Sequence, residues 1–189
     1  MSQPVDGAPA FVYNGHRNAH RADCPEKAQF HRRLRLCGAD TEDTNVTKKK
    51  IGVLGAGTWG MALARMLTVS GNDVQVWSAI EAEVDNLSAA RVHPNLPGMK
   101  IPAQLQFTKS IEEVCTGKDV LLFAVPSVFV RSTTAKARPF IPDGQIIVDV
   151  AKGMEPDTLY TMTEVMADEL RKEDGPKGVK LVALAGPTH

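Results

Sequence analysis

The sequence has few cysteines, no excess of either charge and no long apolar run, and each absence excludes a class of protein. Cys24, Cys37 and Cys115 cannot all pair and provide no disulfide framework, which fits a reducing compartment. The 22 basic residues balance the 22 acidic ones, so neither nucleic acid nor a membrane surface is expected as a partner. The apolar runs 120–125 and 181–185 are far shorter than a bilayer span, and no apolar signal segment follows the N-terminus. We therefore expect a cytoplasmic protein without membrane insertion.

The length of 189 residues allows one globular domain with a buried core, or one domain and a tail. Residues 1–47 show no helical or strand periodicity, and we expect a disordered N-terminal extension there. Three alternatives stay open for them, which are a translation start near Val46, an organelle-targeting segment and a small metal site. The residues with ligand chemistry are His20, Cys24, His31 and Cys37. Their spacing matches no zinc pattern and acidic residues interrupt the targeting pattern, so no metal is expected.

Residues 50–64 have the order of an apolar β-run, a glycine turn and a helix. Gly55, Gly57 and Gly60 form a G-x-G-x-x-G pattern, and in this context the pattern predicts a dinucleotide-binding site rather than a structural turn. Gly55 would make the tight turn, Gly57 would let the backbone approach a pyrophosphate, and Gly60 would let the helix lie close on the strand. The free amides and the positive dipole end of the helix would face the phosphates. The apolar side of this helix is expected at Trp59, Leu63, Met66 and Leu67.

Further β-runs and helical segments alternate along the rest of the chain. Strands are expected at residues 51–54, 74–77, 105–108, 119–125, 145–150 and 179–185, and the run 119–125 is typical of a central strand buried on both faces. Helices are expected at 81–92, at 110–115 with Ser110 as the cap and Cys115 as a small packed hydrophobe, at 128–138, and from an Asp157 cap to Leu170. The alternation predicts an α/β fold, a Rossmann-type doubly wound parallel sheet over residues 48–189.

Two predicted strand ends bear on ligand binding, because ligands lie at the carboxyl ends of strands in open α/β sheets. The second run is followed by Ser78, Ala79, Ile80 and Glu81. No acid stands where the ribose hydroxyl would be bound, and no arginine stands there for a 2′-phosphate. Glu81 is interpreted as a favourable charge at a helix N-terminus. Lys152 directly follows the run 145–150, and its spacing alone leaves both a solvated and a functional lysine open.

Five segments occur together and in one order over residues 48–189. They are Gly55-Ala-Gly-Thr-Trp-Gly-Met-Ala-Leu-Ala64, Asn95-Leu-Pro-Gly98, Ala124-Val-Pro-Ser127 with Arg131, Ala151-Lys-Gly-Met-Glu155 and Ala185-Gly-Pro-Thr188. With these segments the chain resembles the N-terminal, cofactor-binding domain of bacterial-type NAD(P)-dependent glycerol-3-phosphate dehydrogenase.

The resemblance implies NAD(P)H-dependent reduction of dihydroxyacetone phosphate to sn-glycerol 3-phosphate for glycerophospholipid synthesis, and it allows a homodimer of the full-length enzyme. NAD or NADP is the implied cofactor. Its implied contacts are Gly55, Gly57, Thr58, Trp59, Gly60, Ala79, Pro126, Ser127 and Lys152. Lys152, Gly186 and Thr188 would contact the substrate, and Lys152 is the catalytic candidate because it would touch both molecules.

Three departures from the family pattern limit this inference. Ala79 stands where many members have a basic residue, which leaves NAD or NADP open, and Asn95 stands where many have an aromatic one. The sequence also stops at His189, where the family continues into a helical domain with its lysine general base. We therefore expect the chain to bind cofactor weakly and not to turn over the ketone. The alternatives are another two-domain Rossmann dehydrogenase, of the 3-hydroxyacyl-CoA or 6-phosphogluconate type, and a non-catalytic nucleotide-sensing module.

Overall fold

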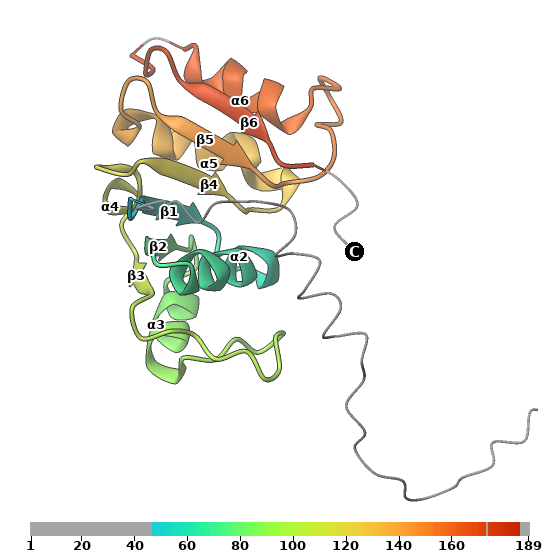
Figure 1. Cartoon of the computed structure of the whole chain (residues 1–189). Helices are drawn as coiled ribbons and strands as arrows, with labels where there is room; N and C mark the ends of the chain where they lie inside the picture. The colour runs from blue at the N-terminus through green and yellow to red at the C-terminus, as the bar shows by residue number, and fades with distance from the viewer. Residues whose placement is uncertain (1–46, 173, 186–189) are drawn as a thin grey trace, which may run out of the picture. The chain divides into compact units, whose positions relative to one another are not determined.

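The computed structural model describes residues 47–172 and 174–185, which form a six-stranded sheet with helices on both faces (Figure 1). The strands are β1 (Lys50–Leu54), β2 (Asp73–Trp77), β3 (Gln106–Thr108), β4 (Val120–Phe123), β5 (Ile146–Asp149) and β6 (Lys180–Ala183). Their order is β3-β2-β1-β4-β5-β6, and every neighbouring pair is parallel. This is the strand order of the Rossmann fold, so the predicted fold class is confirmed. The extension expected at residues 1–47 lies, except for residue 47, outside the described residues.

Five α-helices and two short 3₁₀ turns connect the described strands. They are α2 (Thr58–Val69), α3 (Glu81–Ala90), α4 (Ile111–Cys115), η1 (Ser127–Phe129), α5 (Val130–Ala137), η2 (Arg138–Phe140) and α6 (Met162–Leu170). Side chains of β4 alternate between the two faces: Leu122 packs with residues of α2 and α3, whereas Leu121 and Phe123 pack with residues of α4, α5 and α6. The strand is therefore buried on both faces, as predicted.

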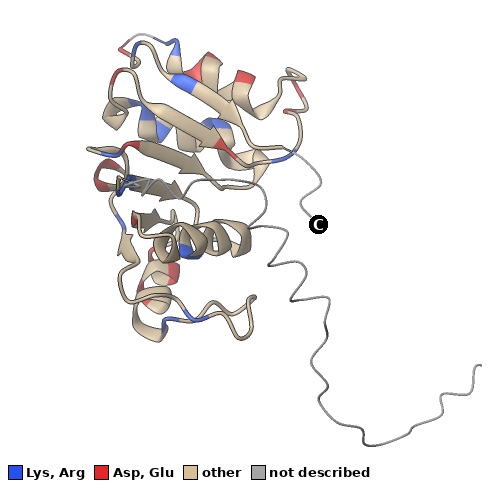
Figure 2. Ribbon diagram, in the orientation of Figure 1, with Lys and Arg blue, Asp and Glu red and all other residues tan. Residues whose placement is uncertain are grey.

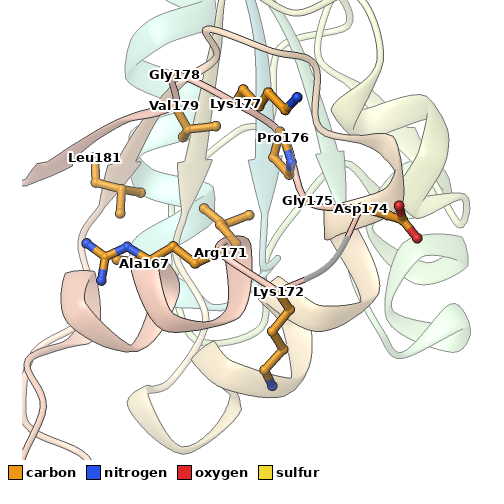
Figure 3. A pocket seen from close by; sticks show the side chains of 11 residues that line it. Ala167, Arg171, Lys172, Asp174, Gly175, Pro176, Lys177, Gly178, Val179 and Leu181 are labelled. Atoms are coloured by element: carbon orange, nitrogen blue, oxygen red, sulfur yellow. The ribbon is translucent and has the colours of Figure 1, made fainter.

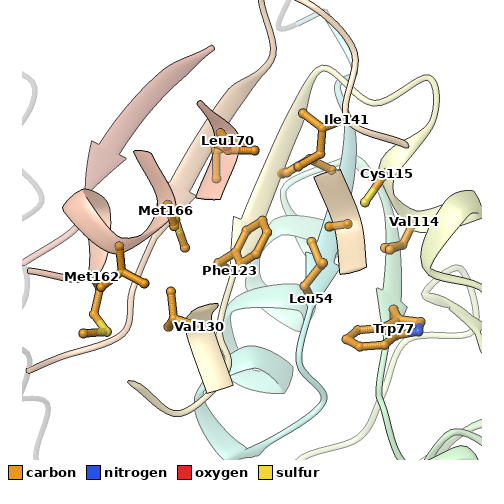
Figure 4. Close-up of a cluster of buried hydrophobic side chains, with 14 residues drawn as sticks. Leu54, Trp77, Val114, Cys115, Phe123, Val130, Ile141, Met162, Met166 and Leu170 are labelled. Atoms are coloured by element: carbon orange, nitrogen blue, oxygen red, sulfur yellow. The ribbon is translucent and has the colours of Figure 1, made fainter. Parts of the chain in front are cut away.

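The larger core cluster lies under α4, α5 and α6 (Figure 4). Phe123 is fully buried near its centre, with Leu54 of β1, Val130 of α5 and Met166 of α6 in the same cluster. Cys115 is also fully buried there, and desolvation raises the pKa of its thiol to about 12. The interpretation of Cys115 as a small packed hydrophobe is thus confirmed.

The buried side of α2 differs from the predicted one. Gly60, Met61, Ala64 and Thr68 are buried, whereas 44% of Trp59 and 52% of Met66 are exposed. The expected Leu63 and Leu67 are only partly buried, at the edge of the core. Close approach of α2 to the sheet at Gly60 turns Met61 and the small residue Ala64 toward the core, and leaves Trp59 and Met66 toward solvent.

Two other helix boundaries were predicted wrongly. The helix α3 ends at Ala90, because Arg91 adopts a left-handed conformation with φ of 52° and its Nη1 donates to the Leu105 carbonyl oxygen at 2.7 Å. The last helix begins at Met162 rather than after Asp157, because Thr161 and Glu164 form a capping box at that point. The predicted Ser110 cap of α4 is confirmed, and it accepts a hydrogen bond from the Glu113 amide at 3.3 Å.

The segment expected as one helix over 128–138 is divided. It consists of η1, α5 and η2 in succession, with Pro139 inside the last turn. Proline lacks an amide hydrogen and cannot continue the helical bonding, so the helix gives way to a tighter turn there. The first turn, η1, directly follows Pro126, at the carboxyl end of β4.

Candidate functional site

A cavity of about 810 Å³ opens at the carboxyl ends of the central strands. It lies at the switch point between β1 and β4, from which the chain departs to opposite faces of the sheet, and this is where ligands bind in open α/β folds. The lining comes from the turn after β1, the end of β2 with the first turn of α3, and the segment after β4 with α5. Its residues are Gly55, Ala56, Gly57, Thr58, Trp59, Trp77, Ser78, Ala79, Ile80, Glu83, Ala124, Val125, Pro126, Phe129, Ser132, Thr133, Lys136 and Val150.

Glycine stands at the three positions of the turn for different structural reasons. Gly55 has a φ of +116°, and a Cβ on it would lie 2.6 Å from the Ala124 carbonyl oxygen. A Cβ on Gly60 would lie 2.2 Å from the carbonyl oxygen of Gly55. Gly57, in contrast, has φ of −64° and ψ of 176°, and a Cβ on it would meet nothing within 4 Å. The fold therefore requires glycine at positions 55 and 60, whereas Gly57 leaves backbone uncovered at the edge of the cavity.

The N-terminus of α2 also faces this cavity without a protein group to satisfy it. Gly57 is its N-cap, no side chain caps it, and its first turn holds no acidic residue. The helices α3, α4 and α6 differ, since each has one or two glutamates in its first turn. Unpaired amides and the positive end of the helix dipole make the start of α2 suited to an anion.

The structure places the other predicted cofactor residues at the same edge of the sheet. Thr58, Trp59, Ala79 and Pro126 line the cavity, and Gly60 is buried beneath it. Ser127 does not line the cavity but lies against the loop after β5, since a Cβ on the neighbouring Gly153 would be 3.7 Å from its Oγ.

The predicted substrate residues are placed only in part. Lys152 is exposed in the loop after β5, outside the lining of the cavity, and precedes Gly153, which lies against Ser127. Gly186 and Thr188 lie outside the described residues. The structure thus brings the loops after β4 and β5 together.

Sequence reasoning missed the side chains that α3, η1 and α5 contribute to the cavity. They are Glu83, Phe129, Ser132, Thr133 and Lys136. Glu83 brings an acid to the cavity from the first turn of α3 rather than from the tip of β2, where a ribose ligand was sought. Glu81, in contrast, lies in the first turn of α3, 3.7 Å from Lys109 Nζ, as the charge at a helix start that was predicted.

A guanidinium anchors the loop that carries Lys152. Arg131 Nε and Nη2 each donate to a carboxylate oxygen of Glu155 at 2.7 Å, while Nη1 donates to Asp168 at 2.5 Å and Glu169 at 3.0 Å. The hydrogen bonds from Arg131 lower the pKa of Glu155 to about 2, so this carboxylate is ionised at neutral pH. The loop after β5 is thereby held against α5 and α6.

A second cavity of about 710 Å³ lies between the end of α6 and the start of β6 (Figure 3). Arg171, Lys172, Asp174 and Lys177 line it, and Lys172 Nζ already donates to Glu169 at 2.6 Å. This place is the amino end of β6, opposite to the edge where ligands bind in such sheets. We therefore assign the functional site to the first cavity.

Over the described residues, charges of one sign do not gather on a single surface (Figure 2). Lys, Arg, Asp and Glu are scattered over helices and loops, with both signs on the α5–α6 side (Figure 2). Within 47–172 and 174–185, no group of three or more His, Cys, Asp or Glu could hold a metal ion. The candidate ligands His20, Cys24, His31 and Cys37 lie outside that part of the chain. No helix in the described part has the length and apolar character needed to cross a membrane.

Comparison with known proteins identifies a family for residues 50–189. The family model described as NAD-dependent glycerol-3-phosphate dehydrogenase N-terminus matches residues 50–189. The protein named glycerol-3-phosphate dehydrogenase (NAD(P)+) 2 from Lactobacillus delbrueckii subsp. bulgaricus is 66% identical over 140 residues, which cover 74% of this chain and 42% of the relative. A relative from Agathobacter rectalis, named glycerol-3-phosphate dehydrogenase (NAD(P)+), is 43% identical over 141 residues, covering 74% and 40%.

A solved structure supports the same assignment. The crystal structure of glycerol-3-phosphate dehydrogenase from Coxiella burnetii matches with a TM-score of 0.67 and 30% identity, over 75% of this chain and 42% of that one. The chain thus spans less than half the length of these relatives. Because the family model covers residues 50–189, the chain belongs to the NAD-dependent glycerol-3-phosphate dehydrogenase family, as its N-terminal part.

Proposed function

We propose that this chain binds NAD or NADP in the cavity at the switch point of the sheet. It would form the cofactor-binding part of a cytoplasmic enzyme that reduces dihydroxyacetone phosphate to sn-glycerol 3-phosphate, the backbone of glycerophospholipids. The observation that carries the proposal is Gly57, which the fold does not require and which leaves the uncapped start of α2 open. The substrate is inferred from the names of the relatives.

The cavity fits a dinucleotide in size and chemistry. Its volume of about 810 Å³ lies within the usual range for cofactor sites, roughly 300–1,000 Å³. The amides at the start of α2 would hold the pyrophosphate, with Thr58 and Trp59 beside it. Apolar side chains such as Val125 and Phe129 would cover the less polar parts of the ligand. The nicotinamide ring, when bound, supplies the hydride, and the protein supplies position and electrostatics.

Lys152 would act at the substrate oxygen. Its loop follows β5 at the cavity edge of the sheet and is held through Glu155 by Arg131. An ammonium beside a ketone can stabilise the negative charge that develops on the oxygen as hydride arrives. We place Gly186 and Thr188 on the substrate side, and the proton donor in the part of the relatives that this chain does not cover.

The test of this proposal is a titration of the 189-residue chain with NADH, followed by nicotinamide fluorescence. We expect saturable binding of one NADH per chain, which added NAD displaces. With dihydroxyacetone phosphate also present, we expect no measurable oxidation of NADH, because the lack of a positioned proton donor costs about 10²- to 10⁴-fold in rate.

Two outcomes would contradict the proposal. Absence of any saturable NADH binding would remove the cofactor role of the cavity. Steady NADH oxidation that persists in the wild-type chain and disappears in Lys152→Ala would place a complete active site within these 189 residues, against the division of roles proposed here.

A further inference from the structure

Two charged side chains line the cavity, and they enter from opposite sides. Glu83 comes from the first turn of α3, next to the end of β2, whereas Lys136 comes from α5, after β4. In this fold the ribose that carries the 2′ position of a bound dinucleotide lies at the end of the second strand. Glu83 is therefore the charged residue on the ribose side.

A buried hydroxyl holds the Glu83 carboxylate in place. Ser78 is 6% exposed, its Oγ accepts a hydrogen bond from the Ile80 amide at 3.2 Å, and it donates to Glu83 Oε2 at 2.5 Å. The two oxygens of a carboxylate accept about four hydrogen bonds, so the bond to Ser78 leaves acceptor capacity. A ribose hydroxyl can donate to such a group. An ionised phosphate cannot, and it carries a charge of the same sign.

The same local arrangement occurs a second time in the sheet. At the end of β3, Thr108 Oγ1 accepts from the Ser110 amide at 3.0 Å and donates to Glu113 Oε2 at 2.5 Å. The bond between hydroxyl and glutamate is thus a general way to close a strand-to-helix turn. Glu113 does not line the cavity, whereas Glu83 does, so the position of Glu83 gives it a relation to the ligand.

The lysine nearest to the first turn of α3 is already paired with other acids. Lys109, just after β3, lies 2.9 Å from Asp85 and 3.7 Å from Glu81, so acids on α3 already engage it. Ala79, at the end of β2, has only a methyl group and brings no cation to the ribose side.

We propose that Glu83, held by Ser78, makes this cavity select NADH over NADPH. The proposal rests on the proposed function, because it assumes that a nicotinamide dinucleotide occupies the cavity. A 2′-phosphate placed at Glu83 would bring two like charges together, and we expect NADPH to bind roughly 10- to 100-fold more weakly than NADH.

The test compares dissociation constants for NADH and NADPH in the 189-residue chain and in four variants. Glu83→Gln keeps an oxygen that can accept from Ser78 but removes the charge, and it should reduce the preference for NADH about tenfold. Ala79→Arg adds a cation at the same strand end and should strengthen NADPH binding. Glu113→Gln is the matched control: it removes the same charge from the same kind of bond outside the cavity, and should leave the ratio unchanged.

Equal or tighter binding of NADPH by the wild-type chain would overturn the inference, as would an unchanged ratio in a folded Glu83→Gln variant. Lys136→Gln tests the competing explanation that the 2′-phosphate lies beside α5. A loss of NADPH affinity in this variant alone would support that position and contradict the role of Glu83. Failure of both nucleotides to bind the wild-type chain would overturn the proposed function and this inference with it.

Discussion

The variant Gly57→Val is expected to lose NADH binding while its fold stays as stable as that of the wild-type chain. The backbone at Gly57, with φ of −64° and ψ of 176°, is open to any residue, and a Cβ there meets no protein atom within 4 Å. The added side chain would occupy the space through which a pyrophosphate approaches the amides of α2. Losing two charge-assisted hydrogen bonds, at about 1.5–3 kcal/mol each, predicts a decrease in affinity of about 100-fold or more.

The measurement is an NADH titration of both proteins together with their thermal midpoints. Gly57→Ala serves as a graded control, because its smaller side chain should weaken binding less than valine does. Wild-type affinity in a folded Gly57→Val protein would mean that the glycine turn does not receive the phosphates.

The variant Gly60→Ala is expected to destabilise the fold itself. Alanine is favoured over glycine in a helix by about 1 kcal/mol, so helix propensity alone would predict stabilisation. The new Cβ would, however, lie 2.2 Å from the Gly55 carbonyl oxygen and 3.2 Å from the Ala124 Cβ. The nearest atom belongs to the backbone of the glycine turn, so α2 would have to move away from the sheet. Overpacking of this kind costs about 3 kcal/mol or more, and a net loss of roughly 2 kcal/mol should remain.

The measurement is the free energy of unfolding of Gly60→Ala and Gly57→Ala by urea denaturation. The two variants can be compared directly, since both add one methyl group to the same turn. At Gly57 the smaller entropy of the unfolded chain, about 0.4–1 kcal/mol, offsets the poorer N-cap, so the stability should change little. A Gly60→Ala protein as stable as Gly57→Ala would show that close packing of α2 on the sheet does not depend on Gly60.

The central strand β4 could be predicted because it is a continuous apolar run. A strand buried on both faces needs apolar residues at every position, and β4 satisfies this with Leu121, Leu122 and Phe123. The buried side of α2 could not be read from periodicity, since close packing at Gly60 brings Met61 and Ala64 to the core. The start of α6 could have been predicted from the sequence, because Thr161 and Glu164 have the spacing of a capping box.

The glycine turn of the site was predictable because strand, turn and helix are adjacent in the sequence. The cavity residues of α5 were not, because the segment expected as one helix over 128–138 is divided into η1, α5 and η2, and the period of one helix does not apply across it. Glu83 lay between these cases. Its spacing from Ser78 repeats that of Thr108 and Glu113, so a search for this repeat would have indicated the bond but not its place at a cavity.

The central claim, that the cavity at the switch point receives the cofactor phosphates, is tested most directly by NMR of backbone amides during addition of NADH. The account predicts the largest shifts at Gly57, Thr58 and Trp59, with smaller ones at Ala79 and none at the second cavity of residues 171–179. Shifts confined to residues 171–179, with the amides of the glycine turn unchanged at saturation, would contradict it.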